Sequence, residues 1–465
     1  MVSYLLIAAC ILVFVSLPYW LPPLVVRLRM SLFARINGGE ALTLPDGELG
    51  PEAFRRIYAH PATSGRSRGA RLSDLFWYWL APGPEMHQEH LENGPRYEKI
   101  AGLTRSILAL PNAEIERLIE KCDARIQDLT LGRPMRMVRL RDVMMPVWAD
   151  FYYEVVFREE CPTEARRLIV AHAHDVVTAL KCCGLRHMRR RNQLTLYIHK
   201  KLQKGQFPHC FPDGFSLQEQ AYYLQGTFFN TAIVQSSEAM AHLLMVLAQH
   251  PETQARLAAA PDDDQLFEDV FNETLRLFPL FGIAHRITSE EIQIDGRTIE
   301  RGSVVCFNYP EYHRMGFDHP DSFEPDRWRR CPMKDANHIP FGMPRNRPCP
   351  AMRVAHVSMR RLTRCLLRRY RFATSAGHTR SLPNRGPCLV AVRDAAGLWP
   401  ALERLLLLGM KVRDRWEDAY RSVAQLVFGT IMILDARRLR LCESYFKNLE
   451  VSSSPAQARG RDVAK

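Results

Sequence analysis

The feature that most restricts the fold is the segment 217–249, which contains few helix breakers and is apolar over most of its length. Its apolar side chains lie nearly all round the helix that their spacing predicts, instead of forming one stripe. A helix of this kind has no side suited to water and must pass through the middle of a domain. Pro251 follows directly and ends the predicted helix. The chain must therefore contain a helical domain large enough to surround this segment.

The rest of the chain is also mainly helical in pattern. Apolar side chains recur at helical spacing over residues 96–260, and helix-forming stretches cover 352–370 and parts of 395–465. Residues 285–310 instead alternate in short runs separated by turn residues, which predicts a small β element. Residues 311–350 are rich in Pro, Asp, His and Arg, which predicts a long ordered loop. With 465 residues, 47% of them apolar, the expected fold class is mainly α with small β-sheets around a large core.

The N-terminus carries a candidate membrane anchor. Its first 26 residues contain no charged side chain and are followed by Arg27 and Arg29. A segment of this length can cross a hydrocarbon layer of roughly 30 Å. A cleaved signal peptide is the competing interpretation, but no basic residue precedes the apolar run and no clean small-residue cleavage site follows it. We expect residues 1–28 to form a single anchor, with the bulk of the chain on the cytoplasmic side because positive residues follow it.

Three short patterns follow the long helix in a fixed order, and their conjunction is far more specific than any one of them. Glu273 and Arg276 lie one helical turn apart, where they can pair. The sequence FEPDRW contains Arg327, which can join the same charge network. The sequence IPFGMPRNRPCPAMRVA places Cys349 between two prolines just before a predicted helix. Backbone N–H groups and the helix dipole stabilise a thiolate at such a position, which suits a soft ligand to iron.

This ordered combination, ExxR, a PxRW-like meander and FGxxxxRxCPA, is similar to the signature of the cytochromes P-450 over about residues 220–395. The resemblance implies the fold of that family, with haem b between the long central helix and the helix that follows the cysteine loop. It implies that Cys349 is the axial thiolate ligand of the haem iron, and that Arg347 and Arg286 pair with the haem propionates. The structural triad that it implies consists of Glu273, Arg276 and Arg327.

The cysteine loop departs from the family pattern. It has one extra residue between Phe341 and Cys349, and Pro344 and Arg345 stand where a glycine is expected. Ala351 replaces the glycine that is usual two residues after the cysteine. We expect the loop to take another path, with the axial role retained and the redox tuning altered.

The central helix departs further, because the family places an acid and a threonine there to deliver protons to bound dioxygen. The family's spacing puts Val234 and Gln235 at these positions, with Ser236 next. Neither a valine nor a glutamine amide can act as a general acid. Gln235 and Ser236 are the candidate catalytic residues, with Ser236, a bound water or a substrate hydroxyl as the proton source. Direct use of hydrogen peroxide, or a rearrangement that needs no activated dioxygen, is the alternative.

Several histidines need a separate interpretation. In the family, the region corresponding to residues 87–105 offers side chains to the haem, but no clear pattern stands out among His87, His90, Arg96, Tyr97 and Arg105. The His-x-x-His pair in HQEH suggests a metal site, yet without further ligands such a pair predicts polar surface. The same prediction applies to His172 and His174, which point to different sides of a helix.

Residues 395–465 extend beyond the usual end of the family, after an expected catalytic domain over residues 29–394. Their pattern predicts a helical extension followed by a disordered tail. The apolar runs 405–408 and 426–434 can pack on the domain, dock a partner or lie at a membrane surface.

The net charge of +13 is compatible with nucleic acid, anionic lipid or an acidic protein partner. The arginines concentrate around Cys349 and along the helix after it, with few aromatic residues between them. We therefore expect no nucleic acid, and a basic face that docks an electron-donor protein, a ferredoxin or a flavin reductase. A merely solvated basic helix is the alternative.

Together these expectations describe a membrane-tethered haem-thiolate monooxygenase, an oxidoreductase that inserts oxygen from dioxygen into a lipophilic small molecule. Substrate contacts are expected from residues 76–86, 228–235 and 280–284. Two alternatives remain. One is a peroxide-dependent or non-oxidative member of the fold, of isomerase or dehydratase type, and the other is a catalytically silent haem-binding scaffold.

Overall fold

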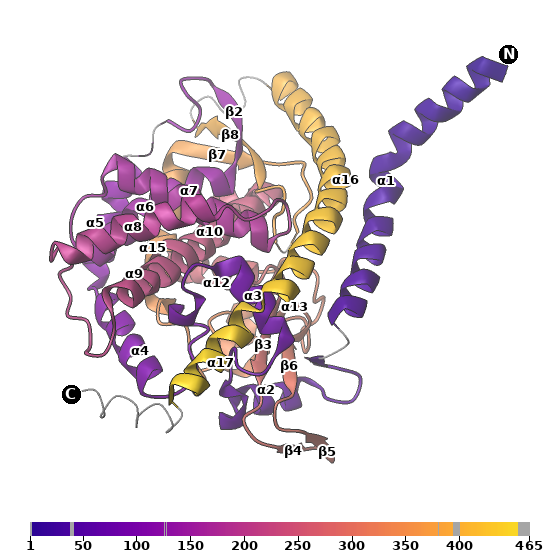
Figure 1. The fold of residues 1–465 in the computed structure, drawn as a ribbon. Helices are drawn as coiled ribbons and strands as arrows, with labels where there is room; N and C mark the ends of the chain where they lie inside the picture. The colour runs from indigo at the N-terminus through magenta and orange to yellow at the C-terminus, as the bar shows by residue number, and fades with distance from the viewer. Residues whose placement is uncertain are drawn as a thin grey trace, which may run out of the picture.

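The computed structural model describes residues 2–37, 41–124, 126, 128–379, 381–393 and 400–453. Figure 1 shows a mainly helical body with small sheets at its edges, which confirms the predicted fold class. The predicted domain boundary between residues 394 and 395 lies outside the described residues, as do residues 454–465, where the extension was expected to end in a disordered tail.

The helical body is built around the predicted core helix, residues 217–249. It consists of α9 (Leu217–Gly226), a π-helical turn (Thr227–Ala232) and α10 (Ile233–Gln249), which follow one another directly. Ser216 and Glu219 form a capping box that starts it. Most of α10 is buried, including side chains all round its axis. The π turn was not predicted, and such turns inside α-helices commonly accompany functional sites.

The helices that surround or support this core are α2 (Pro51–Ala59), α3 (Arg71–Leu80), α4 (Pro95–Ile107), α5 (Asn112–Ala124), α6 (Leu140–Phe157), α7 (Thr163–Leu180), α8 (Met188–Gln203), α11 (Pro251–Ala259), α12 (Asp264–Leu277) and α15 (Met352–Arg369). The predicted loop 311–350 contains only the short helices α13 (Tyr309–Tyr312, at its start) and α14 (Arg327–Arg330) and a 3₁₀ turn (Met333–Asp335). Because α6 and α7 pack directly against α10, the long helix is shielded from solvent.

Three small sheets complete the described fold. The first has the order β1-β6-β3, with β1 (Ala41–Leu44) parallel and β3 (Ile283–Ile287) antiparallel to β6 (Val304–Asn308). The second joins β2 (Met135–Arg139), β8 (Pro387–Val392) and β7 (Tyr370–Ala373), all antiparallel. The third is the hairpin β4 (Ile292–Ile294) and β5 (Arg297–Ile299). The predicted β element within 285–310 is confirmed, whereas β1, β2, β7 and β8 pair only through contacts distant in sequence.

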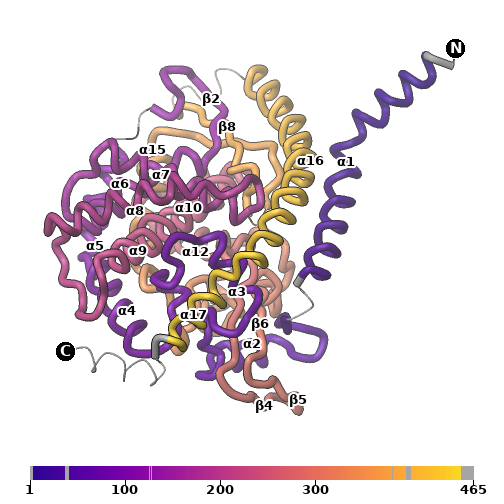
Figure 2. The backbone as a smooth tube through the Cα atoms, viewed as in Figure 1, coloured from indigo at the N-terminus to yellow at the C-terminus, as the bar shows by residue number. Residues whose placement is uncertain are grey.

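The N-terminal and C-terminal helices lie side by side on one flank of the body, as Figure 2 shows. Helix α1 (Val2–Asn37) extends beyond the predicted anchor, because Phe33 and Ile36 pack into a cluster with Met432 and Ile433. The end of α1 nearest the N-terminus stands clear of the body, and the helix as a whole is long and apolar enough to cross a membrane. The extension forms α16 (Pro400–Leu439) and α17 (Leu441–Ser453), both of which contact α3.

Candidate functional site

A cavity separates the central helix from the cysteine loop and α15. The central helix contributes Thr231, Gln235 and Ser236 to its wall. The opposite wall consists of residues of the cysteine loop and α15, among them Phe341 and Cys349. The cavity therefore lies where the resemblance predicts a haem.

The cysteine loop takes a path that its unusual sequence explains. Met343 and Asn346 form an isolated antiparallel bridge, so the extra residue is accommodated in a small turn. Asn346 donates through Nδ2 to the carbonyl oxygen of Tyr58, 2.8 Å away, which ties this turn to α2. The Cys349 N–H donates to the carbonyl oxygen of Phe341 at 2.8 Å, and this bond closes the loop below the cavity. Ala351, in place of the usual glycine, caps α15 without a positive φ.

The Cys349 thiol faces the cavity from the start of α15. Burial raises its pKa, and the backbone N–H of Ala351 opposes that rise. A thiol in this position becomes a thiolate when a metal ion displaces its proton.

Cys442 is one of several buried cysteines that lie away from this cavity. It lies at the start of α17, where its Sγ donates to the carbonyl oxygen of Ser67 at 3.3 Å and its N–H donates to Asp74 at 2.9 Å. It does not line the cavity. Its contacts account for it as a packing residue of the C-terminal extension.

The structure brings Glu273, Arg276 and Arg327 together in one buried network. Arg276 donates through Nε and Nη2 to the two Glu273 oxygens at 2.9 and 2.8 Å, and Arg327 Nε donates to Oε1 at 3.0 Å. Glu273 and Arg276 are fully buried, so each charge depends on the others for compensation. The backbone N–H of Glu324 also donates to Glu273, at 3.0 Å.

The remaining hydrogen bonds of this network hold the meander, the part of the loop 311–350 that contains FEPDRW. Arg276 donates to the carbonyl oxygens of Pro320 and Ser322 at 2.6 and 3.0 Å, and Arg327 donates to that of Asp318 at 2.9 Å. The network thereby fixes the loop that leads to Cys349 against α12.

Three arginines crowd one end of the cavity, and two of them are those that the resemblance assigns to the propionates. Arg286 is buried on β3, and Arg347 is half-buried two residues before Cys349. The third, Arg66, precedes α3, and no sequence pattern singled it out. All three line the cavity. Among the described residues, none of the three has a carboxylate within ion-pair distance.

The surroundings of these cations fit a dianionic group. Burial, together with the nearby charge of Arg66, lowers the pKa of Arg286 to about 10 and that of Arg347 to about 9. One nitrogen of each side chain is buried without a hydrogen-bond partner in the described structure. Buried and uncompensated cations are costly, and two carboxylates would remove that cost. The site therefore fits the propionates of a haem, with Arg66 as an additional partner.

Replacing Arg66 with glutamine is expected to weaken haem retention about tenfold or more, because a hydrogen bond to a charged group contributes about 1.5–3 kcal/mol. The rate of haem transfer to apomyoglobin measures this effect. The apoprotein is expected to become no less stable, because an uncompensated buried charge is removed. Arg96→Gln is the matched control. Arg96 forms an ion pair with Glu219, with 2.6 Å between Nη2 and Oε1, and it does not line the cavity. Equal retention in both variants would contradict the assignment.

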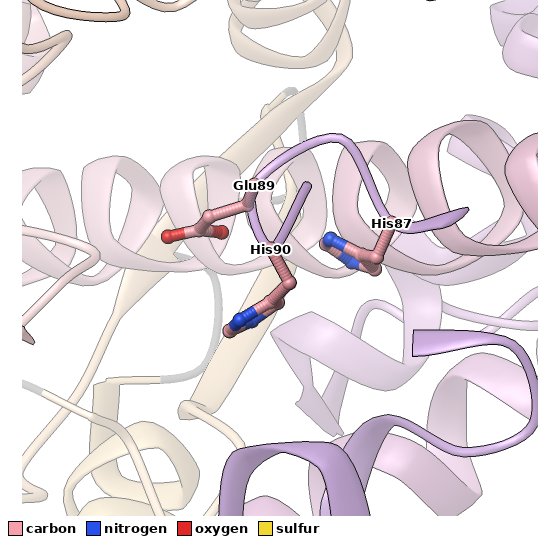
Figure 3. Close-up of side chains that lie close together, drawn as sticks. All are labelled: His87, Glu89 and His90. Carbon is pink, nitrogen blue, oxygen red and sulfur yellow. The ribbon is translucent and has the colours of Figure 1, made fainter. Parts of the chain in front are cut away.

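The prediction that His87 and His90 form a polar surface is wrong. Their exposed fractions are 4% and 6%, because the turn that carries them is pressed between the central helix and β3. Figure 3 shows both rings and Glu89 on this one turn, beside the central helix. His87 Nε2 lies 2.6 Å from Thr231 Oγ1, and Nδ1 of each histidine is buried without a partner in the described structure.

His87, Glu89 and His90 could also be read as a metal site, since their ligand atoms lie within 4.8 Å of one another. The charges nearby argue against it. Burial lowers the pKa of His90 well below its usual value, and the positive charges of Arg66 and Arg347 lower it further. A divalent cation would meet the same repulsion, whereas an anionic propionate would be attracted.

The histidines His172 and His174 lie apart from the cavity. His172 is buried against Gln225 and His174 is half-buried near Arg385, so the prediction of a polar surface is wrong for this pair as well. Their helix α7 packs against the core helix and α8, which covers them.

In the predicted haem-contacting region, Tyr97 lines the cavity with its ring 4.0 Å from the Arg347 guanidinium. Arg105 is exposed and does not line it.

On the central helix, both candidate catalytic residues line the cavity. Ser236 Oγ lies 3.1 Å from the hydroxyl of Tyr152, and Gln235 borders this cavity and a second one beside it. Val234 lines only the second cavity. The nearest acid along the helix is Glu238, whose Oε1 accepts hydrogen bonds from buried basic residues. These partners are Arg141, at 2.5 Å, and Lys181, at 2.8 Å.

The second cavity adjoins the first and is lined by parts of the three predicted substrate-contact segments. Phe76, Trp79 and Leu80 come from α3, and Leu280 to Ala284 come from the segment before and within β3. These apolar side chains share the wall with polar and charged ones, which include His90, His285, Lys181 and Glu238.

The predicted basic docking face is smaller than the sequence suggests. Most arginines of α15 pair with acidic residues of the neighbouring helices α5 and α12. The pairs are Arg360 and Arg364 with Asp264, Arg361 with Glu120, and Arg369 with Asp123. Near Cys349, Arg345 and Arg353 remain exposed.

Comparisons with known proteins agree with this geometry. The family described as Cytochrome P450 matches residues 186–396. A curated relative, cytochrome P450 3A12 of Canis lupus familiaris, is 32% identical over 146 residues, which cover 27% of this chain and 29% of the relative. The chain thus matches less than a third of that relative's length.

Two solved structures share the fold. A six-coordinated cytochrome P450 of Thermus thermophilus has a TM-score of 0.59 at 15% identity, over 78% of this chain and 96% of that chain. A zebrafish cytochrome P450 solved with progesterone has a TM-score of 0.57 at 16% identity, over 74% and 92% of the two chains.

Proposed function

Because the chain belongs to the cytochrome P450 superfamily, whose cofactor is haem b bound by a cysteine thiolate, we propose that it is a haem-thiolate monooxygenase in which Cys349 is the axial ligand. The observation that carries the proposal is the position of the Cys349 thiol in one cavity with the central helix and three uncompensated arginines. Bound there, the haem would supply the activation of oxygen, which a thiolate ligand favours.

The chain's own groups would hold that cofactor and control protons near it. Arg66, Arg286 and Arg347 would bind the propionates. The Ser236 hydroxyl, hydrogen-bonded to Tyr152, would present a proton from the central helix towards the cavity. Gln235 would orient a water molecule but cannot itself act as an acid at neutral pH.

We further propose a lipophilic substrate and an electron-donor protein. The wall formed by Phe76, Trp79, Leu280 and Phe281 supports an apolar substrate, as does the presence of progesterone in a structural relative. The donor, a ferredoxin or a flavin reductase, would dock near the exposed Arg345 and Arg353. Helix α1 would anchor the enzyme in a membrane, with the catalytic domain on the cytoplasmic side.

A peroxide-dependent reaction is the second candidate, and the central helix favours it. The family's spacing puts Val234 and Gln235 at the positions of its acid and threonine. Glu89 is the one carboxylate among the described residues lining the first cavity. An enzyme supplied with peroxide does not require the proton delivery that activation of dioxygen requires.

Isotope labelling separates the two candidates. The haem-loaded chain is incubated with a panel of steroids and fatty acids, once with a reductase, NADPH and labelled dioxygen, and once with labelled hydrogen peroxide. Label from dioxygen in the product supports the monooxygenase, and label from peroxide alone supports the second candidate. No product under either condition, despite bound haem, would favour a silent scaffold and overturn both.

A further inference from the structure

Helix α16 presents an apolar stripe to solvent along nearly its whole length. The exposed apolar residues of this stripe recur every third or fourth position, except between Val412 and Tyr420, where Trp416 stands. They therefore lie on one side of the helix. Their exposed fractions are high, for instance 64% for Leu405, 60% for Leu408 and 70% for Tyr420. The exposed members of the stripe are Leu402, Leu405, Leu408, Val412, Tyr420, Val423, Val427, Ile431 and Leu434.

The charges on the exposed part of α16 have one sign. Its exposed charged side chains are the basic Arg404, Lys411, Arg415 and Arg438. None of the acidic side chains of α16 is fully exposed. Two of them, Glu403 and Glu417, pair with Arg371 and Arg139 of the body. An apolar face bordered by basic residues is the composition of helices that lie in the interface of an anionic bilayer.

This stripe is continuous with the helix that would enter the membrane. Phe14 of α1 packs on Trp416 with ring centroids 4.8 Å apart, and Arg415 donates to the Tyr19 hydroxyl at 2.5 Å. Further along, Arg29 donates to Gln425 at 2.5 Å. Figures 1 and 2 show the two helices descending together on the same flank.

We propose that α16 is a second membrane contact, whose apolar stripe meets an anionic phospholipid bilayer beside α1. The inference rests on the proposed anchor. Because α1 contacts α16 along residues 14–29, a bilayer that receives the apolar part of α1 also meets the stripe. The basic residues beside the stripe would bind the phosphate groups of the lipids. The C-terminal extension would thus fix the orientation of the catalytic domain on the membrane.

Site-specific photo-crosslinking tests the proposal on the full haem-loaded chain. The chain is reconstituted in nanodiscs of phosphatidylcholine and phosphatidylserine, with p-benzoylphenylalanine in place of Tyr420. This probe resembles tyrosine in shape, and an unchanged haem spectrum verifies the fold. Mass spectrometry of the irradiated peptides is expected to show phospholipid adducts at position 420. Leu196, which is 60% exposed on α8, is the matched control position and is expected to give at least tenfold less adduct.

A third probe at Tyr4, 79% exposed on α1, separates the proposal from the anchor on which it rests. Adducts at positions 4 and 420 support both. Lipid adducts at position 4 with none at 420, or adducts between two protein chains at 420, would overturn the membrane contact of α16 and leave the anchor standing. Absence of adducts at position 4 would overturn the anchor and, with it, this inference.

Discussion

Replacing Cys349 with alanine is expected to abolish the red-shifted Soret band that a thiolate-ligated haem gives when reduced and bound to carbon monoxide. Cys349 is the cysteine that lines the cavity among the described residues, and alanine removes its thiol without filling the space that iron requires. The three arginines remain, so some haem is expected to bind without a sulfur ligand. The reduced, carbon-monoxide-bound difference spectrum of purified protein measures the effect.

Cys442→Ala is the matched control for this experiment. Cys442 is also buried, but its thiol contacts Ser67 and not the cavity. The control is expected to keep the spectrum of the unmodified protein. A thiolate spectrum that survives in Cys349→Ala, or that disappears in Cys442→Ala from a folded protein, would contradict the assignment of the ligand.

Replacing Glu273 with alanine is expected to destabilise the chain by about 3–5 kcal/mol, because removing one partner of a buried ion pair leaves uncompensated charge. Here two arginines would lose their carboxylate, and the meander would lose the bond from the Glu324 N–H. Since the meander leads to Cys349, haem incorporation is expected to fall with stability. Urea denaturation and the haem content of purified protein measure the two effects.

Glu120→Ala provides the comparison for this prediction. Glu120 also pairs with an arginine, Arg361, but its side chain is 48% exposed. An exposed pair contributes about 0–1 kcal/mol, so the change in stability is expected to be small. A similar loss of unfolding free energy in both variants would contradict the prediction that the buried triad stabilises the chain more than an exposed ion pair does.

Much of the fold and part of the site could be predicted because the signals are local. The spacing of apolar residues in 217–249 indicates a buried helix without knowledge of its neighbours. Glu273 and Arg276 lie one turn apart on any helix that contains them, and the prolines around Cys349 require a loop before the next helix. The alternation between 285 and 310 likewise depends only on neighbours in sequence.

The cation cluster of the site could not be predicted in full. Arg66 is separated from Arg286 and Arg347 by more than two hundred residues, and only the packing of the η1 turn (Pro61–Ser64) against β3 brings it to the cavity. The burial of His87 and His90 has the same origin, since HQEH is polar in composition and only the helix behind it excludes water.

The long helices and the β element within 285–310 could be predicted because periodicity, turns and caps act between residues a few positions apart. The π turn and the strands β1, β2, β7 and β8 could not, because no local pattern marks them. The sequence by itself also determined the order of Glu273, Arg327 and Cys349 along the chain. Only the folded chain shows that Arg66 joins the cavity, that His87 and His90 are buried, and that α16 lies along α1 with its apolar stripe outward. Burial and long-range pairing depend on the whole packed chain, so no local pattern can report them.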